Sequence, residues 1–244
     1  MIATAQLRGV VVGLIAFAAA EEEMLLASAA SDIADAGDER RWAAVPTVAH
    51  NTEFKAQQAE RITAVLTDCT PPVFGEIDHR SPAVYGRYAA GTALAAASES
   101  RQVTAALLDG VAALGDDDLV DPARHPWLNG RPLWLQLIVR GFWHPTGHVA
   151  DYYLGHRQQG RAVALQEHML AATRYLDAPD QVSGMAAYSL ACAQAVAGNA
   201  DAEDAVRTLA EAIALNPDLR VNADRDPDLQ RLRDTGRLAA ILTG

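Results

Sequence analysis

The chain is poor in cysteine and in aromatic residues. Its 244 residues include two cysteines, Cys69 and Cys192, and only 6% of the residues are aromatic. The cysteines form no Cys-x-x-Cys pair, which excludes a thioredoxin-like redox motif. Few, widely separated cysteines are typical of thiols in a reducing cytosol, and the sequence is also compatible with one disulfide.

Basic residues are too few and too scattered for a polyanion-binding protein. There are 20 lysines and arginines against 31 aspartates and glutamates, which gives a formal net charge of −11. Nucleic acids and anionic membranes are bound through clustered basic side chains. We therefore expect neither as a partner.

The chain also lacks a long apolar run. The apolar stretch Gly9–Ala20 resembles the centre of a signal peptide, but Glu21, Glu22 and Glu23 follow it directly. A bilayer-spanning helix needs about 20 apolar residues, so a first helix of a bundle explains the stretch better. We predict a cytoplasmic protein.

What is present favours helices. Half of the residues are hydrophobic, and alanine is abundant, whereas strictly alternating runs of β-branched and aromatic residues are scarce. This pattern is typical of helices that pack closely through small side chains. The predicted fold class is all-α, and the absence of a glycine-rich phosphate loop and of a nucleophile elbow excludes nucleotide-binding and serine-hydrolase folds.

Apolar periodicity predicts five helical stretches in a first domain, residues 1–178. They cover approximately residues 5–36, 43–67, 82–114, 132 through the histidines at 144 and 148, and 161–176.

A second pattern begins after the linker at residues 178–180. Residues 181–197 and 201–215 form a predicted helical hairpin. The positions of Ala205, Leu209, Ala212 and Pro217 fit the second half of a tetratricopeptide repeat. We assign residues 179–244 to a tetratricopeptide-like module. A single repeat cannot bury its own apolar face, so the module is expected to dock on the bundle or on another subunit.

Three histidines suggest a metal site. His144 and His148 are one helical turn apart and therefore project from one face, while His50 belongs to another predicted helix. Three imidazoles on one ion leave a coordination position open, which is typical of catalytic rather than structural sites. The alternative is chance, because seven histidines scattered at random give an i,i+4 pair in roughly one such chain in six.

Pro145 interrupts the helix that carries the histidine pair. Proline removes one helical hydrogen bond and disfavours helical geometry at the preceding residue, His144. We predict a kink there or a helix that restarts near His144. Gly141 and Gly147 flank this turn, which favours a deformable backbone at a ligand site or, alternatively, a plain packing kink.

Three charged residues near these histidines are candidates for supporting roles. Glu53 and Asp151 each follow a histidine by three residues, and are the candidate catalytic residues, either orienting an imidazole or acting as general base. Arg140, four residues before His144, is the candidate cofactor- or substrate-binding residue, because it could bind a carboxylate. Ordinary solvated side chains are the alternative for all three. His156 is expected to line the site entrance, and His79, His125 and His168 are expected to be solvated or capping residues.

Several of these features recur in one known family. Trp42 and His50 in the second predicted helix, the Asn129–Arg131 lead-in and the His-x-x-x-His-x-x-polar run ending at Asp151 resemble the DinB/YfiT-like superfamily. The resemblance spans about residues 1–176. The superfamily includes the N-terminal domain of mycothiol-dependent maleylpyruvate isomerases. It implies a four-helix bundle whose three matching histidines bind a divalent metal, commonly zinc or nickel. Family members include transferases and isomerases that use thiols such as mycothiol, and self-resistance proteins.

Two functions are therefore expected as alternatives. The first is a metal-dependent enzyme that acts on a small electrophilic molecule by thiol transfer or hydrolysis. The second is a small-molecule-binding or self-resistance protein that sequesters a ligand in the bundle without metal catalysis. An alanine-rich outer face would favour a homodimer, although monomeric bundles carry the same pattern.

Overall fold

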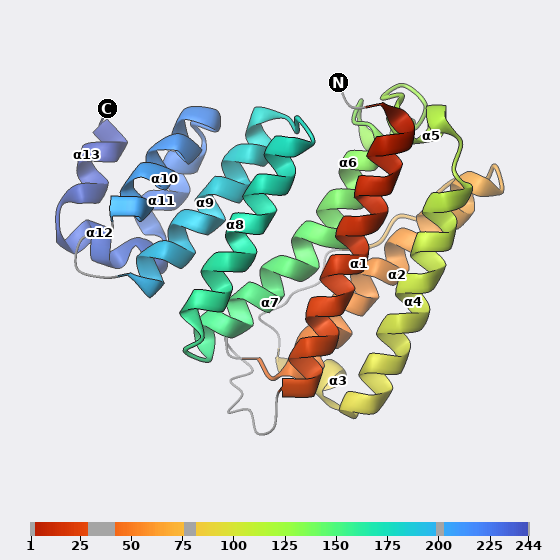
Figure 1. Ribbon diagram of the computed structural model, residues 1–244, viewed down its shortest axis with the longest axis horizontal. Helices are drawn as coiled ribbons and strands as arrows, with labels where there is room; N and C mark the ends of the chain where they lie inside the picture. Colours follow the sequence, from red (N-terminus) through yellow and green to blue (C-terminus); the bar gives the residue numbers. More distant parts are fainter. Residues whose placement is uncertain (1–2, 29–41, 76–81, 199–202, 244) are drawn as a thin grey trace. The chain divides into compact units, whose positions relative to one another are not determined.

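The computed structural model describes residues 3–28, 42–75, 82–198 and 203–243. All regular secondary structure in these ranges is helical, which confirms the predicted all-α class. The elements in chain order are α1 (Thr4–Ser28), α2 (Ala44–Leu66), α3 (Pro82–Ala89), α4 (Ala93–Ala113), α5 (Asp116–Val120), η2 (Pro126–Leu128), α6 (Leu133–Ile138), η3 (Val139–Trp143), α7 (His144–Gly155), α8 (Gln159–Tyr175), α9 (Asp180–Ala197), α10 (Glu203–Leu215), α11 (Leu219–Arg225), η4 (Pro227–Leu229), α12 (Gln230–Asp234) and α13 (Arg237–Thr243) (Figure 1).

The chain divides into two compact units, Met1–Tyr152 (unit 1) and Tyr153–Gly244 (unit 2). The division falls within α7, and α8 belongs to unit 2, where it packs against α9. The domain boundary expected from the sequence, between residues 178 and 179, lies later in the chain than this division. It stays a prediction.

Unit 1 is built on α1, α2, α4 and the continuous segment α6–η3–α7. Helix α2 packs against α4 and η3, and α1 packs against α4 and α6 (Figure 1). Fully buried apolar side chains such as Ile15, Val48, Leu107 and Phe142 fill the space between them. Burial of this apolar surface is the main force that holds the helices together.

The stretch expected as one helix over residues 82–114 is two helices, so that prediction was wrong. The break lies between Ala89 and Ala93, where Gly91 has low helix propensity and Thr92 starts a new helix. The Thr92 side chain accepts a hydrogen bond from the backbone N–H of Ala95 at 3.2 Å, the usual N-capping contact. For the first predicted helix, residues 29–36 lie outside the described residues.

The helix around Pro145 does not break, but its winding changes. Residues Val139–Trp143 form a π-helical turn, and His144 then begins α7 with helical dihedrals of φ −60° and ψ −53°. The wider turn accommodates a proline that has no N–H and would otherwise collide with the preceding turn. The helix thus continues through Pro145, and its winding changes from π to α at His144.

Unit 2 is formed by α8 to α13. Helices α9 and α10 occupy the positions expected for the C-terminal helical hairpin, and α9 packs against both α8 and α10. Gly184 of α9 lies so close to α10 that an added Cβ would be 2.8 Å from Cβ of Asn216. Small residues thus allow close packing, while the likeness to a tetratricopeptide repeat stays a prediction.

Neither cysteine is part of a disulfide. Cys69 is exposed just after α2, and Cys192 is buried in α9. The disulfide that the sequence left open is therefore not formed.

Within the described ranges, no helix has both the length and the apolar character required to cross a membrane.

Candidate metal centre

Three histidine side chains from two helices of unit 1 converge on one point. His50 lies in the middle of α2, and His144 and His148 lie in the first turns of α7. The Nε2 atom of His50 is 3.1 Å from Nε2 of His144 and 3.2 Å from Nε2 of His148. One ring nitrogen of each histidine lies within 4.8 Å of the others. The structure thus brings together all three predicted ligands.

The spacing of these nitrogens fits a shared cation. Imidazole nitrogens bound about 2.0–2.1 Å from a tetrahedral zinc ion lie about 3.3–3.4 Å apart. The observed separations of 3.1 and 3.2 Å are close to that value. A cation accepts all three lone pairs at once, whereas a proton on His50 Nε2 serves one neighbour at a time.

The three imidazoles differ in exposure. His50 is fully buried, at 0% exposure, while His144 and His148 are partly exposed. The buried ligand is therefore fixed by the protein interior, whereas the other two are in partial contact with solvent.

Aromatic rings hold the imidazoles in place. The ring centroid of His50 is 5.8 Å from that of Trp42, 4.8 Å from Phe54 and 5.5 Å from Tyr88. The Phe54 ring also lies 4.1 Å from that of His144. Packed rings restrict imidazole rotation, which is the preorganisation that a metal site requires.

A hydrogen bond joins the two ligand helices beside the histidines. The Asn51 side chain donates from Nδ2 to the carbonyl of Pro145 at 3.3 Å, and Asn51 is fully buried. This bond connects the residue after His50 to the residue after His144. It fixes the register of α2 against α7 at the level of the site.

Glu53 is directed at α3. Its Oε2 accepts hydrogen bonds from the Tyr88 hydroxyl at 2.5 Å and from Arg87 at 3.0 Å. Burial, and then the hydrogen bond to Glu53, raise the pKa of Tyr88 to about 12. Because the Tyr88 ring packs against His50, Glu53 is linked to the centre through Tyr88.

Asp151 and Arg140 lie on the two sides of the ligand pair in sequence. Asp151 is partly exposed on α7, one turn after His148. Arg140 lies in the π-turn with its guanidinium 5.3 Å from the centroid of the Phe54 ring. The catalytic roles expected for Glu53 and Asp151 stay predictions.

A buried ion pair lies further along α2, and sequence reasoning did not single it out. Lys55 and Glu22 are both at 0% exposure, with Nζ and Oε2 2.6 Å apart. Lys55 also donates to Ser100 and Thr104, each at 3.0 Å. Only the run of three glutamates at the end of the first apolar stretch pointed to this region, and that run reads as a solvated helix end.

A pocket of about 410 Å³ opens on a different side of α2 from the histidines. It is lined by residues of α2, α3 and α4 and of the α3–α4 loop, mostly small or charged: Val45, Ala49, Thr52, Glu53, Ala56, Arg87, Tyr88, Gly91, Ala95, Ala96 and Glu99. Tyr88 and Glu53 thus face this pocket, and Tyr88 also packs on His50.

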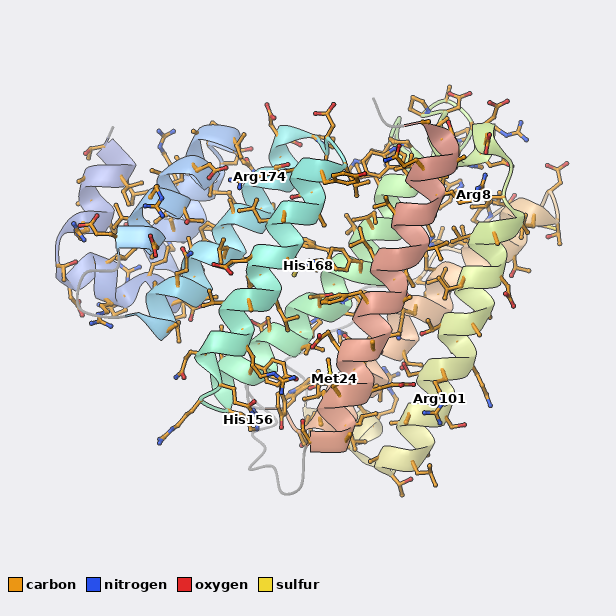
Figure 2. All side chains as sticks on the ribbon, viewed as in Figure 1. Arg8, Met24, Arg101, His156, His168 and Arg174 are labelled. Atoms are coloured by element: carbon orange, nitrogen blue, oxygen red, sulfur yellow. The ribbon has the colours of Figure 1, made fainter. Side chains whose placement is uncertain are left out.

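The remaining histidines are not part of the cluster. His125 was expected to be solvated or capping, but it is buried, with Nε2 2.9 Å from the carbonyl oxygen of Asp118. His168 is exposed on α8 and His156 follows α7; Figure 2 labels both. His79 lies outside the described residues.

Comparisons with known proteins do not identify the chain. No family model matches it, and neither the curated proteins nor the solved structures give a match.

Proposed function

We propose that the chain is a metal-dependent enzyme that acts on a small electrophilic molecule by thiol transfer or by hydrolysis. The observation that carries the proposal is the convergence of the ring nitrogens of His50, His144 and His148 from two helices, with a buried ligand on one side and partly exposed ligands on the other. Zinc and nickel are the proposed metals, because three imidazoles suit both ions.

The sequence features resembling the DinB/YfiT-like superfamily support this proposal. We propose that unit 1 corresponds to a DinB-like four-helix bundle and that α9 and α10 form a tetratricopeptide-like hairpin. Within this proposal the second substrate is a low-molecular-weight thiol such as mycothiol, or water.

When bound, a divalent ion with an open position lowers the pKa of a water or thiol bound to it, so that the nucleophile forms near neutral pH. The chain's own residues do the rest. Phe54 and Tyr88 restrict the imidazole of His50, and Glu53 holds the Tyr88 hydroxyl. Asp151, one turn after His148, is the proposed general base or orienting group.

A second candidate function rests on the pocket beside α2. Its volume of about 410 Å³ is within the range of small-ligand pockets, and the three histidines are not among its lining residues. A protein that sequesters a small molecule there would require no metal.

Elemental analysis of protein purified without an affinity tag or chelator tests the proposal. We expect close to one zinc or nickel per chain in the wild type, loss of this metal in His144→Ala and His148→Ala, and retention in His168→Ala, which changes an exposed histidine on α8. Metal-loaded protein should then consume electrophiles in the presence of a thiol or water. A wild type that stays metal-free after incubation with zinc and nickel contradicts the proposal and favours the sequestering function.

A further inference from the structure

Two arginines of unit 1 lie on elements that pack against each other, and neither has an acidic partner among the described residues. Arg61 of α2 and Arg140 of η3 are both half-buried, and no carboxylate in the described part of the chain pairs with either. Four other arginines of this unit each form an ion pair with a carboxylate. These ion pairs are Arg8–Asp116, Arg87–Glu53, Arg101–Glu23 and Arg124–Asp118. Arg61 and Arg140 differ from these four arginines because they are partly buried without a counter-ion among the described residues.

Aromatic rings support the two guanidinium groups. The Arg61 guanidinium lies 4.9 Å from the centroid of Phe74 and 5.9 Å from that of Trp127, and Arg140 lies over Phe54. A guanidinium stacked on a ring keeps its N–H edges available for hydrogen bonds in the plane. The rings thus hold the donors without using them.

The hydrogen bonds of the pair are incomplete. Arg61 donates from Nε to the Pro72 carbonyl at a long 3.5 Å, and Arg140 Nε is buried with no acceptor among the described residues. Burial lowers the pKa of both arginines, and the positive charge of Arg140 lowers the pKa of Arg61 further. Two like charges that partly lose water without a counter-ion are unfavourable unless an anion joins them.

Arg140 lies next to the histidines, and Arg61 lies about three helical turns from His50 along α2. The Arg140 guanidinium lies 5.3 Å from the centroid of the Phe54 ring, and this centroid is 4.1 Å from that of the His144 ring. His50, Phe54 and Arg61 are also spaced by four and seven residues along α2, which places them on one face of the helix. An anionic group held by Arg140 would thus lie near the Phe54 ring that packs on His144.

We infer that Arg61 and Arg140 form a clamp for the oxyanion group, a carboxylate or a phosphate, of the small molecule on which the protein acts. That this molecule is a substrate rests on the proposed function, but anion binding by the two arginines does not require the metal. Arginine suits this role because its planar fork binds both kinds of oxyanion through two parallel hydrogen bonds. The inference narrows the substrate class to anionic electrophiles.

Anion binding to metal-free protein tests the clamp, because chelation removes direct contact between the anion and a metal. The probes are inorganic phosphate and benzoate, each titrated calorimetrically against a background of sodium chloride at constant ionic strength, with benzamide as the neutral analogue of benzoate. The variants are Arg61→Met and Arg140→Met. The matched control is Arg101→Met, an exposed arginine of α4 labelled in Figure 2.

We expect phosphate or benzoate, or both, to bind the wild type. The same anion should bind Arg101→Met with equal affinity, and benzamide should bind neither protein. Each clamp variant should bind that anion about tenfold more weakly or worse, the effect of losing charge-assisted hydrogen bonds. Arg140→Lys should bind at an intermediate level, since it keeps the charge and loses the fork. Preference for phosphate or benzoate identifies the oxyanion group.

Melting temperatures of the same samples check folding. In chloride alone the methionine variants should melt no lower than the wild type, because each removes a like-charge repulsion, and only the wild type and the control should be stabilised by the anion. Failure of both anions to bind the wild type, or equal binding to the clamp variants, overturns the inference. Elemental analysis separates the two proposals: metal without anion binding overturns the clamp alone, and anion binding without metal overturns the metal-dependent function alone.

Discussion

The Nε2 atoms of His50 and His144 lie 3.1 Å apart, although 94 residues separate them in the sequence. The contact joins the middle of α2 to the first residue of α7. A metal held there would cross-link two helices that are otherwise joined at this level by packing and by the hydrogen bond from Asn51. Metal binding should therefore raise the stability of the folded protein, in addition to appearing in its elemental composition.

Zinc is expected to raise the melting temperature of the metal-free protein. A ligand that binds only the folded state at 100 times its dissociation constant contributes about 2.7 kcal/mol. The effect should disappear in His50→Ala, and it should weaken near pH 5 because protonated imidazoles cannot bind metal. Differential scanning calorimetry measures it, with magnesium as the control ion because magnesium prefers oxygen ligands. Equal stabilisation by zinc in wild type and His50→Ala would contradict a site built on His50.

Part of this arrangement follows from sequence spacing. The four-residue step between His144 and His148 places both on one helical face, and the periodicity around His50 predicts the second helix. That His50 faces the pair was a hypothesis, because spacing within a helix says nothing about which helices touch. The structure supplies that contact.

Other features depend on tertiary contacts that sequence patterns do not reveal. The break at Gly91 was missed because the alanine-rich residues on both sides are strong helix formers. The π-turn was missed because the sequence indicates strain at Pro145 but not how the backbone relieves it. The electrostatic interaction of Arg61 with Arg140 likewise depends on the packing of α2 against η3.

Removing one partner of the buried ion pair should strongly destabilise the protein. Lys55→Met leaves the Glu22 carboxylate buried without its cation, and loss of one partner of such a pair costs about 3–5 kcal/mol. The double variant Glu22→Leu/Lys55→Met should be much more stable than Lys55→Met, because two apolar groups replace two charges. Urea denaturation followed by circular dichroism gives the three free energies. Additive losses in the double variant would show that the two charges do not depend on each other.

Ionisation of the Tyr88 hydroxyl should lower the free energy of unfolding as the pH becomes alkaline. Its pKa is about 12 in the folded protein and 10.0 for an ordinary tyrosine, so the unfolded chain ionises first. The contribution of Tyr88 is therefore complete below pH 10 and is lost as the pH rises from about 10 to 12. Tyr88→Phe should cost about 1–2 kcal/mol at neutral pH by removing the hydrogen bond to Glu53, and should weaken the fall in stability across that pH range.

Absorbance at 295 nm, which follows tyrosinate formation, checks the assignment. One tyrosine titrating near pH 12 should be missing in Tyr88→Phe. The metal content of this variant should match that of the wild type, because Tyr88 packs on His50 through its ring and the phenylalanine ring remains. A missing titration step centred near pH 10, the ordinary pKa of tyrosine, would contradict the raised pKa of Tyr88.

Two glycines that flank the histidine turn provide a matched pair of substitutions. An added Cβ at Gly141 would lie 2.9 Å from Cγ1 of Ile15 and 3.2 Å from its Cδ1, whereas a Cβ at Gly147 would have no atom within 4 Å. Gly141→Ala must therefore push η3 away from α1, and overpacking of this kind costs about 1–3 kcal/mol. Gly147→Ala should instead stabilise by about 0.5–1 kcal/mol, because alanine favours the helix.

The same pair tests whether the π-turn positions the metal ligands. Gly141 lies three residues before His144, so a displaced turn should also move that imidazole and weaken zinc affinity in Gly141→Ala. Gly147 is adjacent to His148 but has free space around it, so its alanine variant should bind zinc as the wild type does. Competition with a chromophoric chelator measures both affinities. Because the two variants add the same methyl group on either side of His144, unchanged affinity in Gly141→Ala would mean that the ligand geometry does not depend on the packing of η3 against α1.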